Sequence, residues 1–444
     1  MDMDSDGKET QESIESSDRG LPGPSRQTTP VRPKPAVNEQ AREKSKQSIS
    51  VRGVAVELCC GMGGMGIGLR ELGFDVRAAY DVWSDAVAVY NHNFGEDAAQ
   101  TCNLLQEAGR QLVRARKAHL GDIELLAAGP PCKGFSQLRN GFHDGRNGHN
   151  RVLRAMPEYV ALLRPRMFLI ENVPALLSHR QGKTLEALLA KLQRPAPRLS
   201  YRVEYGVYDA AACGTPQARK RVLILGVREG SGNESLPEPD PDLAPLFAAI
   251  RHSTPIPDQM RQYHRQLLSP RALTLTTAKQ ALSDLPSLGA GNLEEQLRYA
   301  TRPQSAYQRW ARQGAPQLLS DTRTPAVTAE TLKRLILVPP GGCARSIPET
   351  HLNGLLRRYD SAYRRLHPDA PSTALSTKYD CVYHFEQHRS LSVREYARLQ
   401  GIPDRVTFPQ ELTCRRSAYE MIGNSVPPLL VKHVLARALG IVES

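Results

Sequence analysis

The chain has 444 residues, of which 40% are hydrophobic, so it can bury a sizeable core and form two or three domains. No apolar run approaches the roughly 20 residues of a membrane span, and the polar N-terminus does not resemble a secretory signal. The eight cysteines form no CxxC pair, which argues against a zinc ribbon or a disulfide framework and favours a reducing compartment.

The net charge of +12 is carried by the body of the chain. Residues 1–50 contain nine acidic and eight basic side chains and few large apolar ones, so we expect a disordered tail. The rest of the chain therefore carries about +13. Because neutralising phosphates releases counterions, a basic folded body favours a nucleic acid as partner.

Apolar strands and helical segments alternate from residue 51 to about residue 228. We expect strands at 54–58, 75–80, 123–128, 167–170, 201–208 and 222–227, and helices near 69–72, at 84–93 and at 152–163. This alternation predicts an α/β fold with a mostly parallel sheet covered by helices on both faces. Ligands bind such sheets at the carboxyl ends of the strands. Four polar candidates fall there and indicate one shared site: Glu57, Asp81, Cys132 and Glu171.

A glycine-rich loop at 61–68 follows the first strand and precedes a helix. Glycines there allow a tight turn and the close approach of a ligand. Asp81 lies 20 residues after Gly61, where a carboxylate can accept hydrogen bonds from ribose hydroxyls. The two features together predict a nucleoside-containing cofactor. The glycines could instead serve helix packing, and Asp81 could instead cap the helix at 84–93.

Residues 124–136 form an apolar strand, then Gly-Pro-Pro-Cys, then a polar loop. Pro130 and Pro131 restrict the backbone, so Cys132 would be held in a stiff turn at the end of the strand. A thiol held in this way suits a nucleophile, although a free cysteine is more often a small buried residue. Further along, Arg219 and Arg221 alternate on an extended segment and should point to one face.

From about residue 231 the chain is rich in proline and weakly patterned. Residues 290–370 contain twelve Lys or Arg against seven Asp or Glu, with five Tyr or Trp among them, and we expect a smaller, irregular domain. Helical patterns return at 392–400 and 428–439. The expected division is a tail at 1–50, a first domain at 51–250, a small domain at 251–400 and a segment at 401–444 that returns to the first domain.

Six motifs stand in a fixed order along nearly 400 residues. They are the glycine loop, Gly-Pro-Pro-Cys at 129–132, Glu-Asn-Val at 171–173, Gln-x-Arg-x-Arg at 217–221, the run from 389 to 403, and Gly-Asn-Ser-Val-Pro at 423–427. Any one motif is unspecific, but the ordered set resembles the DNA cytosine-5 methyltransferases over residues 54–228 and 371–439. The resemblance implies a Rossmann-like sheet with a small target-recognition domain, S-adenosylmethionine as cofactor and double-stranded DNA as substrate. We also expect a monomer, in the bacterial cytoplasm at the nucleoid or in a eukaryotic nucleus.

The resemblance also implies roles for individual residues. Cys132 would attack C6 of a flipped-out cytosine, and Glu171 would hold N3 and the exocyclic amine. Arg219 and Arg221 would orient the base and support the nucleophile, and loop 133–150 would be a mobile lid. The residues implied in cofactor binding are Glu57, Cys59, Gly61, Met62, Gly63, Gly64, Asp81, Val82, Asn103, Pro130, Asn424 and Val426. No metal site is expected.

Several positions depart from the family pattern. Glu57 and Cys59 stand in a motif that usually reads Asp-Leu-Phe. Asp81 replaces a Glu, Asn103 replaces an Asp that meets adenine, and Met421 replaces a common Gln. These changes bear on cofactor affinity and leave the catalytic positions intact.

Other functions stay open at this point. The same chemistry could act on tRNA cytosine, which chain length does not exclude. A catalytically silent DNA-binding relative is a second alternative, against which the intact Cys132, Glu171 and 217–221 motif argue. A dinucleotide oxidoreductase would leave the Pro-Pro-Cys turn and the basic C-terminal half unexplained. The leading hypothesis is a DNA methyltransferase of bacterial restriction-modification or orphan type.

Overall fold

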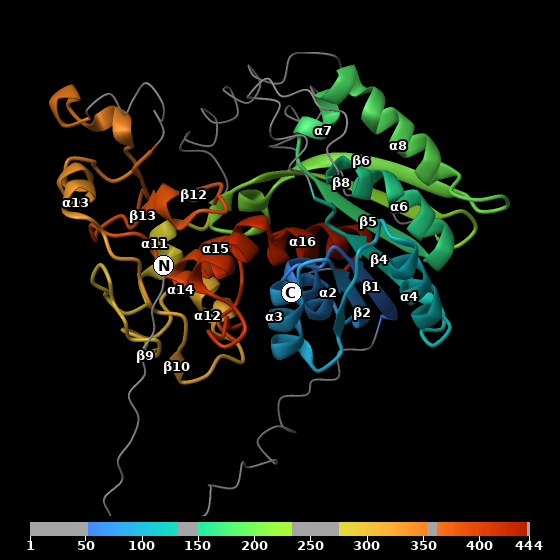
Figure 1. Cartoon of the computed structure of the whole chain (residues 1–444), viewed down its shortest axis with the longest axis horizontal. Coiled ribbons are helices and arrows are strands. Elements are labelled where there is room, and N and C mark those ends of the chain that lie inside the picture. The colour runs from blue at the N-terminus through green and yellow to red at the C-terminus, as the bar shows by residue number, and fades with distance from the viewer. Residues whose placement is uncertain (1–51, 132–148, 233–274, 353–361, 442–444) are drawn as a thin grey trace, which may run out of the picture. The chain divides into compact units, whose positions relative to one another are not determined.

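The computed structural model describes residues 52–131, 149–232, 275–352 and 362–441, all within one compact unit (Figure 1). The tail expected at 1–50, Cys132 and nearly all of the expected lid lie outside the described residues. The domain boundaries expected near 250 and 400 stay predictions. Within the described ranges, no helix has both the length and the apolar character that crossing a membrane requires.

A seven-stranded sheet lies at the centre of this unit. Its strands are β1 (Val54–Leu58), β2 (Asp75–Asp81), β3 (Ala99–Thr101), β4 (Ile123–Ala128), β5 (Met167–Asn172), β6 (Tyr201–Asp209) and β8 (Lys220–Arg228). They are ordered β3-β2-β1-β4-β5-β8-β6. Neighbours from β3 to β5 are parallel, whereas β8 runs antiparallel to β5 and β6. The expected α/β fold with a mostly parallel sheet is confirmed.

Helices cover both faces of the sheet because each strand directs apolar side chains to both faces. Val56 and Leu126 pack on one face with three helices: α4 (Glu107–Lys117), α6 (His149–Leu163) and α8 (Lys183–Gln193). Ala55 and Leu125 pack on the other face with α2 (Gly64–Glu71) and α16 (Pro428–Ala438). Helix α3 (Ser84–Phe94) packs against β2 and β3. Figure 1 shows the sheet between these two sets of helices.

The chain changes direction across the sheet at β1. It runs outward from β1 through β2 to β3, and then crosses back to form β4 on the other side of β1. The carboxyl ends of β1 and β4 therefore flank a topological switch point, where open α/β sheets bind their ligands. The glycine loop follows β1 and the Gly-Pro-Pro turn follows β4, so the fold brings both motifs to this crevice.

The chain after residue 275 forms further cores with little regular sheet. Its helices include α11 (Ala278–Leu282), α12 (Ala306–Ala311), α13 (Ala329–Ile336), α14 (Val393–Gln400) and α15 (Arg415–Asn424). Two-residue strands pair as β9 (Leu297–Arg298) with β10 (Leu318–Leu319), β11 (Arg364–Arg365) with β13 (Val382–Tyr383), and β12 (Ser372–Thr373) with β7 (Gln217–Ala218). One of these cores includes Ile67 of α2 and Val89 of α3, so it is continuous with both helices.

The elements that were not expected from the sequence include α4, α8, α15 and β3. Helix α4 buries only Gly109 and Val113, so its sequence carries little apolar periodicity. Strand β3 has only three residues. Helix α2 begins at Gly64, five residues before the expected segment, because its glycines are packed within the helix rather than in the loop.

Candidate active site at the carboxyl ends of the strands

The glycine loop leaves β1 with a left-handed backbone. Cys59, Gly61 and Gly63 have φ angles of 55°, 53° and 99°. A Cβ added at Gly61 would meet no atom within 4 Å, so this part of the loop faces open space. Cys59 holds a conformation that costs energy for a residue with a side chain, and such strain often accompanies functional sites. The loop is therefore shaped for the close approach of a ligand at Gly61.

Asp81 joins the glycine loop to the end of β2. Its Oδ2 accepts from the Gly61 amide at 2.8 Å and its Oδ1 accepts from the Trp83 amide at 2.9 Å. Burial raises the pKa of Asp81, while these amide hydrogen bonds oppose the rise. The N-cap of α3 is Trp83, without a side-chain hydrogen bond, so the alternative in which Asp81 caps α3 is wrong. The carboxylate instead lies at the switch point, and each oxygen has further acceptor capacity.

The side chains beside Asp81 fit a nucleoside. Val82 is 65% exposed, which leaves an apolar surface next to the carboxylate that can receive an aromatic base. Asn103 is half-buried, and its Oδ1 accepts from the Leu105 amide at 3.0 Å. An amide at this position therefore fixes the local turn before α4. Open space at Gly61, an acceptor at Asp81 and apolar Val82 together match the parts of an adenosine group.

The glycines inside α2 serve packing. A Cβ on Gly64 would lie 2.0 Å from Ser425 Oγ and 2.4 Å from the Val426 carbonyl oxygen, and one on Gly68 would lie 2.6 Å from the Pro428 carbonyl oxygen. The alternative interpretation of the motif is thus correct for this half of it. Gly61 faces open space, whereas the helical glycines let the segment after α15 approach α2.

Glu171 forms a buried ion pair at the end of β5. Its Oε1 lies 2.6 Å from Arg221 Nε, and both side chains are mostly buried. Burial raises the pKa of Glu171, against the charges of Arg221 and Arg219. A carboxyl group of this kind binds a proton more readily than an exposed glutamate does.

Asn172 connects this pair to the Gly-Pro-Pro turn. Its side chain is 1% exposed, and its Nδ2 donates to the carbonyl oxygen of buried Pro130 at 3.2 Å. The end of β5 therefore fixes the backbone that leads to Cys132. The position of Cys132 itself lies outside the described residues.

Arg219 and Gln217 contact a different part of the molecule. Arg219 Nη2 donates to the Gly423 carbonyl oxygen at 2.6 Å, and Nη1 donates to the Leu375 carbonyl oxygen at 3.1 Å. Gln217 is fully buried and donates to the Leu399 carbonyl oxygen and to Gln400 Oε1. The one-face arrangement expected for Arg219 and Arg221 stays a prediction, and the charges of both arginines act on Glu171. Their hydrogen-bond partners differ, because those of Arg219 lead towards the C-terminal helices whereas Arg221 pairs with Glu171.

A family model described as C-5 cytosine-specific DNA methylase matches residues 54–439. The chain belongs to the C-5 cytosine-specific DNA methylase family. It is 27% identical to Type II methyltransferase M1.HphI of Haemophilus parahaemolyticus over 391 residues, which covers 86% of each chain. It is also 27% identical to Type II methyltransferase M.AgeI of Thalassovita gelatinovora, covering 84% of this chain and 96% of that one.

Two solved structures share the fold of this chain. An E. coli prophage-encoded protein assigned as a DNA modification methyltransferase has a TM-score of 0.63 at 19% identity, covering 87% of this chain and 98% of that chain. The S. pombe Dnmt2 methyltransferase has a TM-score of 0.50 at 15% identity, covering 88% and 99%. At these identities the likeness shows the fold alone.

The remaining residues implied in cofactor binding lie around the switch point or near it. Glu57 and Met62 are buried beneath the glycine loop, and Val426 is buried between α2 and the end of β4. Asn424 is exposed at the end of α15. Met421, where the methylase family commonly has Gln, is buried in a core rather than placed at the crevice.

Sequence reasoning missed three residues that organise the site. Asn172 holds Pro130, Tyr90 donates to the buried Glu57 carboxylate, and Gln400 donates to the Ser425 carbonyl oxygen. Asn172 and Gln400 lie inside motifs that carried the resemblance to the methylase family, so their positions were a usable signal. Tyr90 looks in the sequence like any apolar residue of α3.

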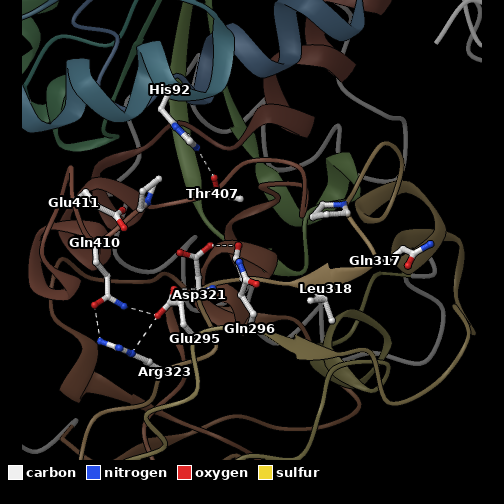
Figure 2. Close-up of a pocket in the computed structure, with 13 residues that line it drawn as sticks. His92, Glu295, Gln296, Gln317, Leu318, Asp321, Arg323, Thr407, Gln410 and Glu411 are labelled. Carbon is white, nitrogen blue, oxygen red and sulfur yellow. Dashed lines mark hydrogen bonds and ion pairs between the residues drawn. The ribbon is translucent and has the colours of Figure 1, made fainter. Parts of the chain in front are cut away.

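A separate cavity of about 760 Å³ lies near β9, β10 and the end of α3 (Figure 2). Glu295, Arg323 and Gln410 bond to one another there, and His92 bonds to Thr407. None of the residues implied in cofactor or base binding lines this cavity. It is therefore distinct from the candidate methylase site.

Proposed function

We propose that this protein is a DNA cytosine-5 methyltransferase that acts through a covalent bond between Cys132 and C6 of a flipped-out cytosine. The observation that carries the proposal is the buried Glu171–Arg221 pair, next to the Asn172 side chain that holds the turn before Cys132. The chain thus presents a carboxyl group and a thiol-bearing turn from adjacent strands, β5 and β4.

Glu171 is suited to recognise cytosine. Because burial raises its pKa, the carboxyl group can hold a proton and donate it towards N3 of the ring. Its other oxygen can accept from the exocyclic amine, and Arg221 fixes the orientation of the group. Negative charge that develops on the ring during attack at C6 is then stabilised in a buried site.

Cys132 is the proposed nucleophile. Its thiolate adds to C6, which interrupts the aromatic system and makes C5 nucleophilic. Bound S-adenosylmethionine would supply an electrophilic methyl group for C5. Methyl transfer would leave S-adenosylhomocysteine as product. Transfer of the C5 proton to a base or to water, with departure of the thiolate from C6, then restores the aromatic base and regenerates Cys132. Burial raises the pKa of the Cys59 and Cys60 thiols, which disfavours the thiolate form that a nucleophile needs at these two positions.

The crevice between β1 and β4 would hold the cofactor. Asp81 would accept from the ribose hydroxyls, Val82 would contact adenine, and the open backbone at Gly61 would allow close approach. Asp81 is one methylene shorter than the glutamate usual in the family, and the Asn103 amide oxygen already accepts from Leu105. We infer that cofactor affinity depends chiefly on Asp81 and the glycine loop.

Double-stranded DNA is the proposed substrate. Residues 51–444 carry a net charge of about +13, and residues 290–370 combine basic and aromatic side chains. A base must leave the duplex to reach a carboxyl group buried at a strand end, which requires flipping. We propose that residues from this stretch read the target sequence.

Trapping with 5-fluorocytosine tests the mechanism, because fluorine at C5 cannot leave as the proton does. Wild-type protein, S-adenosylmethionine and duplexes of many sequences should give a protein–DNA crosslink that mass spectrometry places at Cys132. The variant Cys132→Ala should lose methyl transfer and crosslinking while it retains DNA binding. Turnover by this variant, or a crosslink at another cysteine, would overturn the mechanism.

A further inference from the structure

We propose that Arg219 and Gln400 are positioning residues of the cofactor site, which they serve by holding the 423–426 turn against the glycine loop. The proposal rests on the proposed function, since it takes the crevice between β1 and β4 as the cofactor site. It separates Arg219 from Arg221, which the family pattern places together on the side of the target base.

Two buried side chains anchor the 423–426 turn. Arg219 is 5% exposed and donates to the Gly423 carbonyl oxygen at 2.6 Å. Gln400 is fully buried and donates to the Ser425 carbonyl oxygen from the opposite element, α14. Gln217 joins the two anchors, because its Oε1 accepts from Arg219 and its Nε2 donates to Gln400. Two of the four carbonyl oxygens in the turn are therefore held by long, buried side chains.

The 423–426 turn lies at the switch point. Ser425 and Val426 lie directly against Gly64, where a Cβ would come within 2.0 Å of Ser425 Oγ. Val426 also lies next to Gly129, whose added Cβ would be 3.5 Å from Val426 Cγ2. The turn thus fills the space between the first turn of α2 and the end of β4. A shift of the turn would change the walls of the crevice in which Asp81 and Gly61 lie.

Arg221 has different partners from Arg219. Its Nε pairs with Glu171, and it lies one strand position beyond Lys220 in β8. Arg219 lies between β7 and β8, where its amide donates to Asp209 and its guanidinium reaches the turn. The charges of both arginines act on Glu171, and lysine would keep both charges. Loss of the Arg221 guanidinium geometry should therefore perturb the base side through the Glu171 pair, whereas loss of the Arg219 geometry should perturb the turn and with it the cofactor side. Lysine cannot reproduce the paired donors of either arginine.

Calorimetric titration with S-adenosylhomocysteine, without DNA, tests this division. Arg219→Lys should weaken binding about tenfold, as expected for loss of a charge-assisted hydrogen bond that orders the site. In steady-state assays it should raise the KM for S-adenosylmethionine by a similar factor. The matched variant Arg221→Lys should bind S-adenosylhomocysteine within about twofold of wild type and should lose turnover instead.

A second variant guards against misfolding of the first. Gln400→Met keeps a side chain of similar length in the core but removes the donor to Ser425, and it should also weaken S-adenosylhomocysteine binding. Thermal unfolding of each variant establishes that it is folded. If wild type binds the ligand and both Arg219→Lys and Gln400→Met bind it equally well, the inference is overturned. Equal weakening in Arg221→Lys overturns it too, whereas a wild type that binds no ligand refutes the proposed function.

Discussion

Glu57 is a carboxyl group buried beneath the glycine loop, with only 1% of its surface exposed. Gly66 donates to its Oε1 at 3.2 Å, Tyr90 donates to its Oε2 at 3.1 Å, and Arg70 donates to the Tyr90 hydroxyl. Burial raises the pKa of Glu57 to about 7, although the Arg70 charge and these hydrogen bonds oppose the rise. The Glu57 carboxyl group therefore gains or loses its proton near neutral pH. Residues of both α2 and α3 donate hydrogen bonds to it.

The raised pKa predicts how stability depends on pH. The folded state holds the Glu57 proton more tightly than the unfolded state does. Protonated Glu57 therefore adds to the free energy of unfolding at low pH, and this stabilisation is lost as pH rises towards 7. Relative to Glu57→Gln, wild type should lose about 2 kcal/mol between pH 5.5 and pH 8. Urea unfolding across this range measures the difference. The exposed control Glu349→Gln should run parallel to wild type, and a parallel course for Glu57→Gln would contradict the prediction.

At the scale of elements, α14 is the clearest case in which charge lies inside the protein. Arg394 and Arg398 are fully buried, and Arg389 just before the helix is 1% exposed. Arg389 pairs with Glu395 at 2.7 Å, and although burial opposes ionisation, this arginine lowers the pKa of Glu395 to about 2. Arg394 pairs with Asp321 at 2.7 Å. The helix therefore organises its surroundings through ion pairs as well as through Val393, Tyr396, Ala397 and Leu399, which it contributes to a hydrophobic core.

Arg398 connects α14 to three other segments. It pairs with Asp404 at 2.6 Å and with Asp284 at 3.1 Å, and it donates to the Ala281 carbonyl oxygen in α11. Its own carbonyl oxygen accepts from Tyr307 in α12. Although burial alone would lower the pKa of Arg398, these two aspartates raise it. The guanidinium is thus the nearest counter-charge of two buried carboxylates, whose other arginine partners lie at 3.4 Å (Arg312 to Asp284) and 3.7 Å (Arg394 to Asp404).

Arg398→Leu should cost about 3–5 kcal/mol of unfolding free energy, because it leaves Asp284 and Asp404 buried without their main partner. Urea unfolding at neutral pH measures the loss. The matched control is Arg309→Leu on α12, an exposed site where the same substitution should change stability by less than about 1 kcal/mol. Equal losses at the two positions would show that the buried network is not what stabilises this region.

At the scale of the whole molecule, residues proposed for chemistry and residues proposed for target reading come from different parts of the chain. Glu171, Asn172 and Arg221 belong to the seven-stranded sheet. In its described parts, 290–352 and 362–370, the basic stretch forms short elements without extended strands. It also contains Tyr307 and Asp321, which bond to α14, so part of it is structural.

Exchanging residues 290–370 for the equivalent stretch of a relative with another target should change which sequence is methylated. Tyr307 and Asp321 should be retained in the exchange so that the partners of α14 survive. Because the sheet is untouched, methyl transfer should continue. Bisulfite sequencing of DNA from cells that express each protein reports both the activity and the sequence context. If the methylated sequence stays the same, the target is read elsewhere in the chain.

Local pattern was enough to predict six of the seven strands of the central sheet. Strands such as β1, β4 and β5 are continuous apolar runs because both of their faces are covered, and their ends carry the polar residues of the site. The order of six motifs predicted the family, and the charge of the body predicted a nucleic acid. Helix α4 could not be predicted in this way, because it buries only Gly109 and Val113 and leaves no periodic apolar pattern. Helix α15 buries Ala418, Tyr419, Met421 and Ile422 at helical spacing, so its pattern was a usable signal that was missed.

Tertiary structure alone decided which contacts are made by residues that look alike within one sequence motif. The sequence presents Gly61 and Gly64 as one motif, and Arg219 and Arg221 as one pair. In the folded protein Gly61 faces open space while Gly64 meets Ser425, and Arg219 holds Gly423 while Arg221 holds Glu171. The physical reason is that the burial and hydrogen bonds of a side chain depend on residues that are distant in the sequence. The Gly423 partner of Arg219 lies more than 200 residues away, and no local periodicity encodes such a partner.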